Sequence, residues 1–144
     1  MYSQLFVRFA VATAFLSAVA DRLGFWGPPG SVNASWGNWA NFVAYSNQLN
    51  FFVPASVGTL LAIGATVLEV LLAFLLLVGF WTRFAALLSG ILLAAFALTM
   101  TLSFGIKVTF NYSVWVGASA CFLLGGYKAF PFSIDAYLEK HRRK

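Results

Sequence analysis

The sequence predicts an all-α integral membrane protein, and two observations carry that prediction. Of the 144 residues, 61% are hydrophobic and only 9% are charged, whereas soluble domains carry about 25% charged residues. Four apolar segments follow one another along the chain, separated by short turns or polar stretches. A chain of this length cannot bury so much apolar surface in one core, so lipid must cover the rest. We therefore expect one transmembrane four-helix bundle over residues 1–144, with helices at about 4–22, 54–80, 83–103 and 110–127.

The first helix raises the question of a signal peptide. Ala18-Val19-Ala20 resembles a signal-peptidase site at the end of an apolar stretch. However, no Lys or Arg precedes Arg8, whereas signal peptides begin with a positively charged region. We therefore expect the first helix to remain in the protein.

The segment 24–53 is the one long connection between predicted helices, and we expect it on the outer side. It begins with the turn cluster Gly27-Pro28-Pro29-Gly30. Apolar residues then recur at helical spacing between polar ones, at Trp36, Trp39, Phe42 and Val43. This pattern predicts a short amphipathic extracytoplasmic helix that lies on the outer surface of the bundle.

The second helix carries a single carboxylate, Glu69, near the middle of its apolar run. A charge at the centre of a membrane helix costs about 2.5–3.5 kcal/mol on insertion scales, so we expect it to be paired, protonated or turned to a polar cavity. It shares a face with small residues at steps of three and four, Gly58, Ala62, Ala65 and Ala73. Small residues allow membrane helices to approach closely, so we expect Glu69 to face the bundle.

The third and fourth helices complete the bundle. The tight connection 79–83 predicts an antiparallel hairpin of the second and third helices. The fourth helix has small residues four apart, and Cys121 is one step of that stripe. We expect this cysteine to fill space as a small apolar residue rather than act as a reactive thiol.

The tail 128–144 follows the fourth helix. Pro131 ends that helix, Ser133 is placed to cap a new one, and the chain closes with a basic run. We expect a basic interfacial helix at anionic lipid headgroups, which attract basic residues by about 1 kcal/mol each. His141 belongs to this basic end, so we assign it no catalytic role.

The distribution of Lys and Arg predicts that both termini are cytoplasmic. In that orientation only Arg22 and Lys107 lie outside, and seven basic residues lie inside: Arg8, Arg83, Lys128, Lys140, Arg142, Arg143 and Lys144. Cytoplasmic ends of membrane proteins carry such an excess of Lys and Arg.

Two groups of polar residues are candidate sites. On the inner half we expect a polar core of Glu69, Arg8 and Arg83, with Arg8 as the partner of Glu69 because the two lie at similar depth along their helices. This group either pins the register of the helices or forms a proton or ligand site, for example for a quinone headgroup, and both alternatives stay open. On the outer face we expect a site of Asp21, Arg22, Trp36 and Trp39, in which Asp21 and Arg22 pair with each other, with Lys107 or with the outer loop.

Several kinds of chemistry find no support in the sequence. There is no Ser/His/Asp set, phosphate-binding loop, dinucleotide fingerprint or metal cluster, and there is one His and one Cys. We therefore expect no metal, no covalently bound cofactor and no nucleic acid. The chain also lacks the paired broken helices that mark solute transporters.

Three motifs carry a family resemblance over nearly the whole chain. They are Leu5-Phe6-Val7-Arg8, Asp21-Arg22-Leu23-Gly24, and Leu68-Glu69 followed by Leu77-Val78-Gly79-Phe80-Trp81-Thr82-Arg83. In this order they resemble the DoxX-like family of small four-helix membrane proteins, which includes a subunit of thiosulfate:quinone oxidoreductase. The segment 24–53 is longer than in the family's simpler form, and nothing in it points to thiosulfate.

The resemblance implies a protein of the bacterial cytoplasmic membrane and a subunit or accessory of a quinone-linked redox assembly. Its expected partners are membrane lipid, a partner redox subunit and a second copy of the chain, and its expected ligand is a quinone. If the chain takes part in an enzyme, it does so as an oxidoreductase subunit. The alternative is a non-catalytic membrane scaffold or a protein that binds a small molecule or lipid.

Overall fold

The computed structural model describes residues 2–142, which form seven α-helices and no strand. The helices are α1 (Tyr2–Arg22), α2 (Trp39–Leu49), α3 (Ala55–Val78), α4 (Thr82–Phe104), α5 (Ile106–Asn111), α6 (Val114–Gly125) and α7 (Ile134–Arg142). Helices α1, α3 and α4 are 21, 24 and 23 residues long and apolar enough to cross a membrane. The predicted all-helical class is therefore confirmed, three helices are compatible with a membrane bundle, and their bounds agree with the prediction to within two residues.

The structure divides the segment 110–127, for which one continuous helix was predicted. Helix α5 ends at Asn111 and α6 begins at Val114. Between them Ser113 has a φ of 54°, in the left-handed region that a continuous right-handed helix excludes. Helix α6 has 12 residues, so by itself it rises only about 18 Å.

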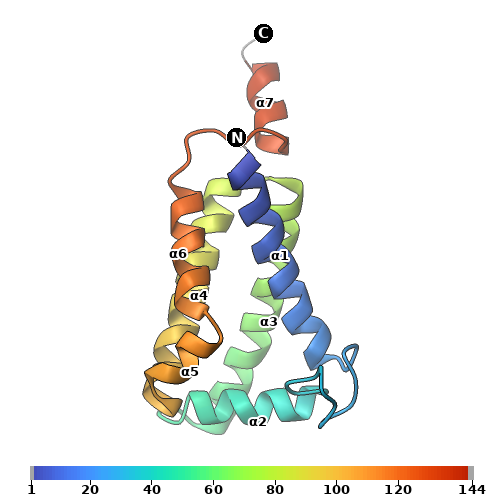
Figure 1. Ribbon diagram of the computed structural model, residues 1–144, viewed down its shortest axis with the longest axis vertical. Coiled ribbons are helices and arrows are strands. Elements are labelled where there is room, and N and C mark those ends of the chain that lie inside the picture. The colour runs from blue at the N-terminus through green and yellow to red at the C-terminus, as the bar shows by residue number, and fades with distance from the viewer. Residues whose placement is uncertain (1, 143–144) are drawn as a thin grey trace.

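The long helices run along the main axis of the molecule (Figure 1). Helix α1 packs mainly against α3, and α4 packs mainly against α6. One end of the bundle carries the N-terminus, the turn between α3 and α4, and α7; we call it the terminal end. At the opposite end, the α2 end, α2 crosses the bundle almost at right angles to the other helices (Figure 1).

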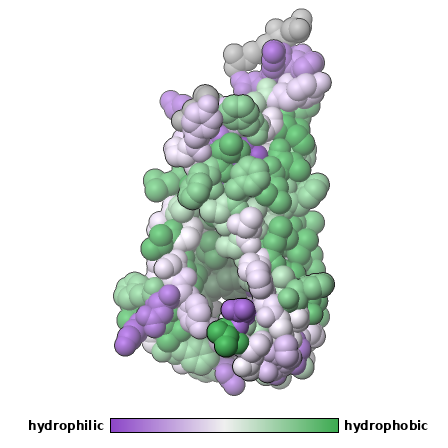
Figure 2. All heavy atoms as spheres, turned by 45° about the vertical axis from the view of Figure 1, so that its right-hand side comes forward, coloured by the Kyte–Doolittle hydropathy of each residue, from purple (hydrophilic) through white to green (hydrophobic). Residues whose placement is uncertain are grey.

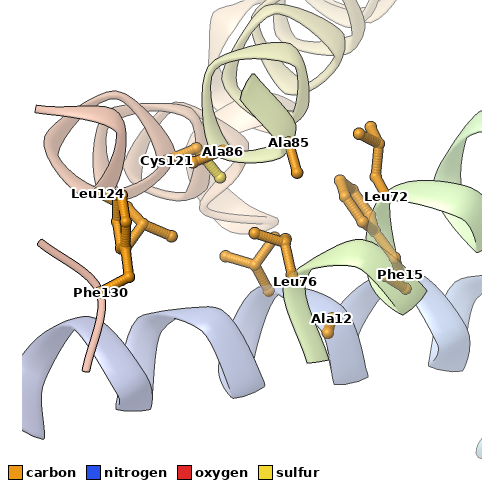
Figure 3. Close-up of a cluster of buried hydrophobic side chains, with 11 residues drawn as sticks. Ala12, Phe15, Leu72, Leu76, Ala85, Ala86, Cys121, Leu124 and Phe130 are labelled. Carbon is orange, nitrogen blue, oxygen red and sulfur yellow. The ribbon is translucent and has the colours of Figure 1, made fainter. Parts of the chain in front are cut away.

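The apolar core of the bundle draws on all four of the long or apolar helices. Phe15 of α1, Leu72 and Leu76 of α3, and Leu124 of α6 meet there around the small residues of α4 and α6 (Figure 3). Cys121 is fully buried in this cluster, beside Ala86. Its predicted place on a packing stripe is therefore confirmed.

The predicted small-residue face of α3 also faces the bundle. Gly58, Ala62, Glu69 and Ala73 are buried, and Ala65 is partly buried. On α4, Gly90 lies so close to the ring of Phe122 of α6 that an added Cβ would force the ring to move. Glycine at this position therefore allows α4 and α6 their close approach.

Helix α2 is held at its end of the bundle by polar contacts. Asn38 caps its first turn by accepting a hydrogen bond from the backbone N–H of Asn41 at 2.8 Å. Ser46 donates to the carbonyl of Gly58 in α3, and Ser103 of α4 donates to the carbonyl of Leu49. The last two bonds tie the C-terminal part of this short helix to two different long helices.

Helix α7 extends from the terminal end (Figure 1), and none of its residues is buried. Ser133 caps it, as predicted, by accepting a hydrogen bond from the N–H of Ala136 at 3.1 Å. The predicted basic residues Arg143 and Lys144 lie outside the described residues. Apolar side chains cover the middle of the face seen in Figure 2, and hydrophilic ones gather toward both ends.

Candidate functional site

Glu69 is buried and paired with Arg22, the last residue of α1. Arg22 Nη2 donates to Glu69 Oε1 at 3.0 Å, and Arg22 Nη1 lies 2.5 Å from Glu69 Oε2. Nη1 also donates to the hydroxyl of Thr66, one turn earlier on α3, at 2.7 Å. The side chains of Arg22 and Glu69 are 3% and 2% exposed, so the two charges neutralise each other away from solvent.

The prediction that Arg8 is the partner of Glu69 is wrong. Arg8 contacts the carbonyl of Leu76, which lies seven residues after Glu69 on α3. Along the helix axis, Glu69 is therefore about 10 Å from the position that Arg8 contacts. Arg22 lies fourteen residues beyond Arg8, or about 21 Å, so Glu69 is roughly midway between the two arginines along the axis. Depth alone therefore does not choose between them.

The direction of the side chains makes the choice. A helical side chain leans toward the N-terminus of its own helix. Because α1 and α3 are antiparallel, Arg22 leans toward the terminal end while Glu69 leans toward the α2 end, and they meet. Arg8 leans away from Glu69. The pair therefore forms with the arginine that the sequence argument had assigned to the outer face.

Arg8 instead caps the end of α3. Its side chain, fully buried, donates to the carbonyls of Leu76 at 2.8 Å and Leu77 at 3.2 Å, and to that of Phe132 at 3.2 Å. The last carbonyls of a helix lack partners within the helix, and an arginine satisfies them well. Gly79, with a φ of 68°, lies against the guanidinium where a Cβ would not fit. Arg8 thus joins α1, α3 and the segment before α7.

Arg83 does not join any polar core in the structure. It is exposed near the start of α4. The predicted inner group of Glu69, Arg8 and Arg83 is therefore distributed over three separate environments, because each arginine points to a different part of the bundle.

Asp21 is held by the outer loop, one of the alternatives that the sequence left open. Its carboxylate accepts hydrogen bonds from the backbone N–H groups of Ser35, Trp36 and Gly37, at 2.9, 3.1 and 3.3 Å. Gly37 has a φ of 68°, and a Cβ there would overlap the backbone of Pro28 and Pro29. The charge of Asp21 is thus balanced by peptide N–H dipoles rather than by a side-chain cation.

Two aromatic rings cover Arg22. The ring of Phe42 in α2 lies 3.9 Å from the guanidinium carbon, and the ring of Trp36 lies 5.5 Å from it. Asp21, Arg22 and Trp36 are therefore together, as predicted for the outer face. Trp39 lies against Phe42, with ring centroids 5.5 Å apart, and has no recorded contact with Arg22. Phe42 was not predicted as a site residue, although its place on the apolar face of the expected helix was a signal for it.

A cavity of ≈ 1640 Å³ lies beside this group. It is visible as a hollow in the lower half of the molecule in Figure 2. Its wall comes from α1, α2, α3, α4 and α6 and is largely apolar. The charged residues on the wall are Asp21, Arg22 and Glu69, and exposed residues of α1 and α6, such as Ala14 and Val116, also line it. The cavity is therefore an apolar space with one polar corner.

Two buried atoms in this corner have no hydrogen-bond partner within residues 2–142. They are Arg22 Nε, although both Nη atoms of that residue are engaged, and Glu69 Oε2. A buried polar group without a partner is costly, and such groups occur where a ligand or water completes the site.

Other residue types give no second site. Residues 2–142 hold no group of three His, Cys, Asp or Glu placed to bind a metal ion. No family model, curated protein or solved structure matches the chain significantly. The polar corner and its cavity are therefore the features from which a function must be argued.

Proposed function

We propose that the protein binds a membrane-soluble amphiphile, with its polar head at the Arg22–Glu69 pair and its apolar chain in the cavity. The observation that carries this proposal is the position of a buried ion pair, in which Arg22 Nε and Glu69 Oε2 have no hydrogen-bond partner, on the wall of a cavity of ≈ 1640 Å³. Small-molecule sites combine an apolar wall with a few polar groups in the same way and measure about 300–1,000 Å³. The larger volume suits a head together with part of a long chain.

Among amphiphiles, a quinone is the proposed ligand. Its carbonyl oxygen would lie at the guanidinium of Arg22, and its ring would lie near Trp36 and Phe42, which flank the guanidinium. In a redox assembly the two electrons for reduction to the quinol come from a partner subunit. The motifs at Arg8, Asp21-Arg22 and Glu69 through Arg83 support this reading through their resemblance to the DoxX-like family.

The proposed setting is a bacterial cytoplasmic membrane with both termini on the cytoplasmic side. The described basic residues support this orientation, since Arg8, Arg83, Lys128, Lys140 and Arg142 belong to the terminal end and Lys107 to α5 at the other end. In this setting α1, α3, α4 and the α5–α6 segment form four passes. Helix α2 covers the outer side, and α7 meets the cytoplasmic surface.

Quinone binding by Trp36 fluorescence tests the proposal. The protein in phosphatidylcholine nanodiscs is titrated with a short-chain ubiquinone, and quenching is expected to saturate. In Trp36→Phe the saturable part of the quenching should fall, while in Trp81→Phe, at the opposite end, it should persist. Quenching that rises linearly with quinone, as for simple partitioning into lipid, would overturn the proposal. Saturable binding without turnover in the presence of any electron-donating partner would favour the non-catalytic alternative.

A further inference from the structure

The charges on the cavity wall determine which kind of head the cavity accepts. Arg22 is the one basic residue among the lining residues, and Glu69 engages both of its Nη atoms. Asp21 is the remaining charged lining residue, and three backbone N–H groups satisfy it. The wall therefore carries no uncompensated positive charge.

We infer that Glu69 is a selectivity-determining residue that makes the cavity accept uncharged polar heads and reject anionic ones. The inference rests on the proposed function, because it assumes that an amphiphile occupies the cavity. An arginine alone at this place would bind a carboxylate or a phosphate in the fork geometry that it now offers to Glu69. Glu69 already fills that position, and its own charge repels a second anion in a space of low dielectric constant.

The atoms of this corner without a hydrogen-bond partner are one donor, Arg22 Nε, and one acceptor, Glu69 Oε2. A ketone, ester or hydroxyl oxygen accepts a hydrogen bond from such a donor without bringing a charge into the cavity. Phe42 covers the guanidinium carbon at 3.9 Å, which further restricts the approach of a second anion to Arg22. The class that the wall prefers to anions is therefore a neutral polar head on an apolar chain.

A pair of probes with the same chain isolates the effect of the head. Methyl laurate and laurate compete with the short-chain ubiquinone in nanodiscs, and protein-free nanodiscs give the partitioning of each probe into lipid. After that correction, methyl laurate should displace the quinone at a concentration at least tenfold lower than laurate in the wild-type protein. This first measurement needs no variant. Equal or better displacement by laurate would overturn the inference.

The variants then assign the preference to Glu69. Glu69→Gln leaves Arg22 uncompensated, so the preference for the ester should fall at least tenfold or reverse. The double variant Arg22→Gln with Glu69→Gln removes both charges. Its preference for methyl laurate over laurate should therefore lie within threefold of the wild-type preference. Glu139→Gln, the other glutamate of the chain and an exposed residue of α7, is the matched control and should leave it unchanged.

The outcomes separate the two proposals. If the quinone does not bind in the wild type, the proposed function fails. If the quinone binds and Glu69→Gln binds it too, but the ratio between ester and laurate stays within twofold of the wild type, the proposed function stands and the role of Glu69 is refuted.

Discussion

The carboxylate of Asp135 caps a helix that begins 53 residues earlier, by accepting the backbone N–H of Thr82 at 2.7 Å. It also accepts the N–H of Trp81 at 2.9 Å, while its own N–H donates to the carbonyl of Gly79. Helix α4 has no local side-chain cap, because Trp81 holds the N-cap position in a left-handed conformation. The first turn of α7 thus supplies from a distance the cap that the sequence at the start of α4 lacks.

Removal of this cap should destabilise α4 and release α7. Asp135→Ala is expected to lower the free energy of unfolding by about 1–2 kcal/mol, in the range of lost N-caps. Unfolding in mixed detergent micelles measures the change, and limited proteolysis should cut the segment before α7 faster. Asp135→Asn keeps one acceptor oxygen, so its free energy of unfolding should lie between those of the wild type and the alanine variant. If the asparagine and alanine variants are equally stable, the cap depends on the charge of Asp135 and not on its hydrogen bonds.

Arg22 and Glu69 should show strong coupling in a double-mutant cycle. Either single alanine substitution leaves a buried charge alone, and each should cost about 3–5 kcal/mol. The double substitution should cost clearly less than the sum of the two, by at least about 1 kcal/mol, since neither charge remains. Arg83→Ala removes an exposed arginine and serves as the control, with a change within about 0.5 kcal/mol. Additive costs for Arg22 and Glu69 would contradict the pairing.

Asp21 should hold the outer loop closed. In Asp21→Ala three N–H groups lose a charged acceptor, so the loop should open at a cost of about 3 kcal/mol, taken from hydrogen bonds to charged groups. The emission of Trp36 should then shift to longer wavelength, and protease should cut within 24–38 sooner. Val32→Ala, in the same loop and fully exposed, should leave both measurements as in the wild type.

Alanine at two glycines, Gly64 inside α3 and Gly79 just after it, should change the stability of the protein in opposite directions. Gly79→Ala places a Cβ in a left-handed position, against the side chains of Arg8 and Ser133, and should cost at least about 1–2 kcal/mol. Gly64→Ala meets open space inside a helix and should stabilise the protein by up to about 1 kcal/mol. Thermal unfolding of the two variants measures both changes, and a Gly79→Ala variant as stable as the wild type would contradict the structure at Gly79.

Cys121 should be protected from thiol reagents in the folded protein. Its side chain is fully buried between α4 and α6, so a maleimide should react only after the bundle unfolds. Val32→Cys in a Cys121→Ala background provides the exposed comparison and should label at least a hundredfold faster under native conditions. Equal labelling rates would mean that the packed core opens readily.

The helices and their inward faces were accessible from sequence because they depend on local patterns. Small residues three and four positions apart share a face with Glu69 and predict that it points into the bundle. The length of the apolar runs predicts the helices α1, α3 and α4. The break at Ser113 was not predicted, since Asn111-Tyr112-Ser113 contains neither Gly nor Pro and its left-handed residue is a serine.

Pairings across the bundle were harder to predict. The partner of Glu69 depended on the direction in which two antiparallel helices point their side chains, which a comparison of depths omits. The acceptors of Arg8 include the carbonyl of Phe132, which reaches it only because the chain folds back over the end of α3. Such contacts join residues more than one hundred positions apart, and no local pattern records them.

The placement of the ion pair also bears on how the protein can diverge. Arg22, Glu69 and Thr66 belong to α1 and α3, whereas α4 and α6 contribute to the cavity a wall of mostly apolar side chains such as Leu92, Phe96 and Val116. A substitution on α4 or α6 would therefore change the width and length of the space without touching the charges. Under the proposed function, substitutions on α4 and α6 would change the length of the ligand chain that fits while leaving the recognition of its head unchanged.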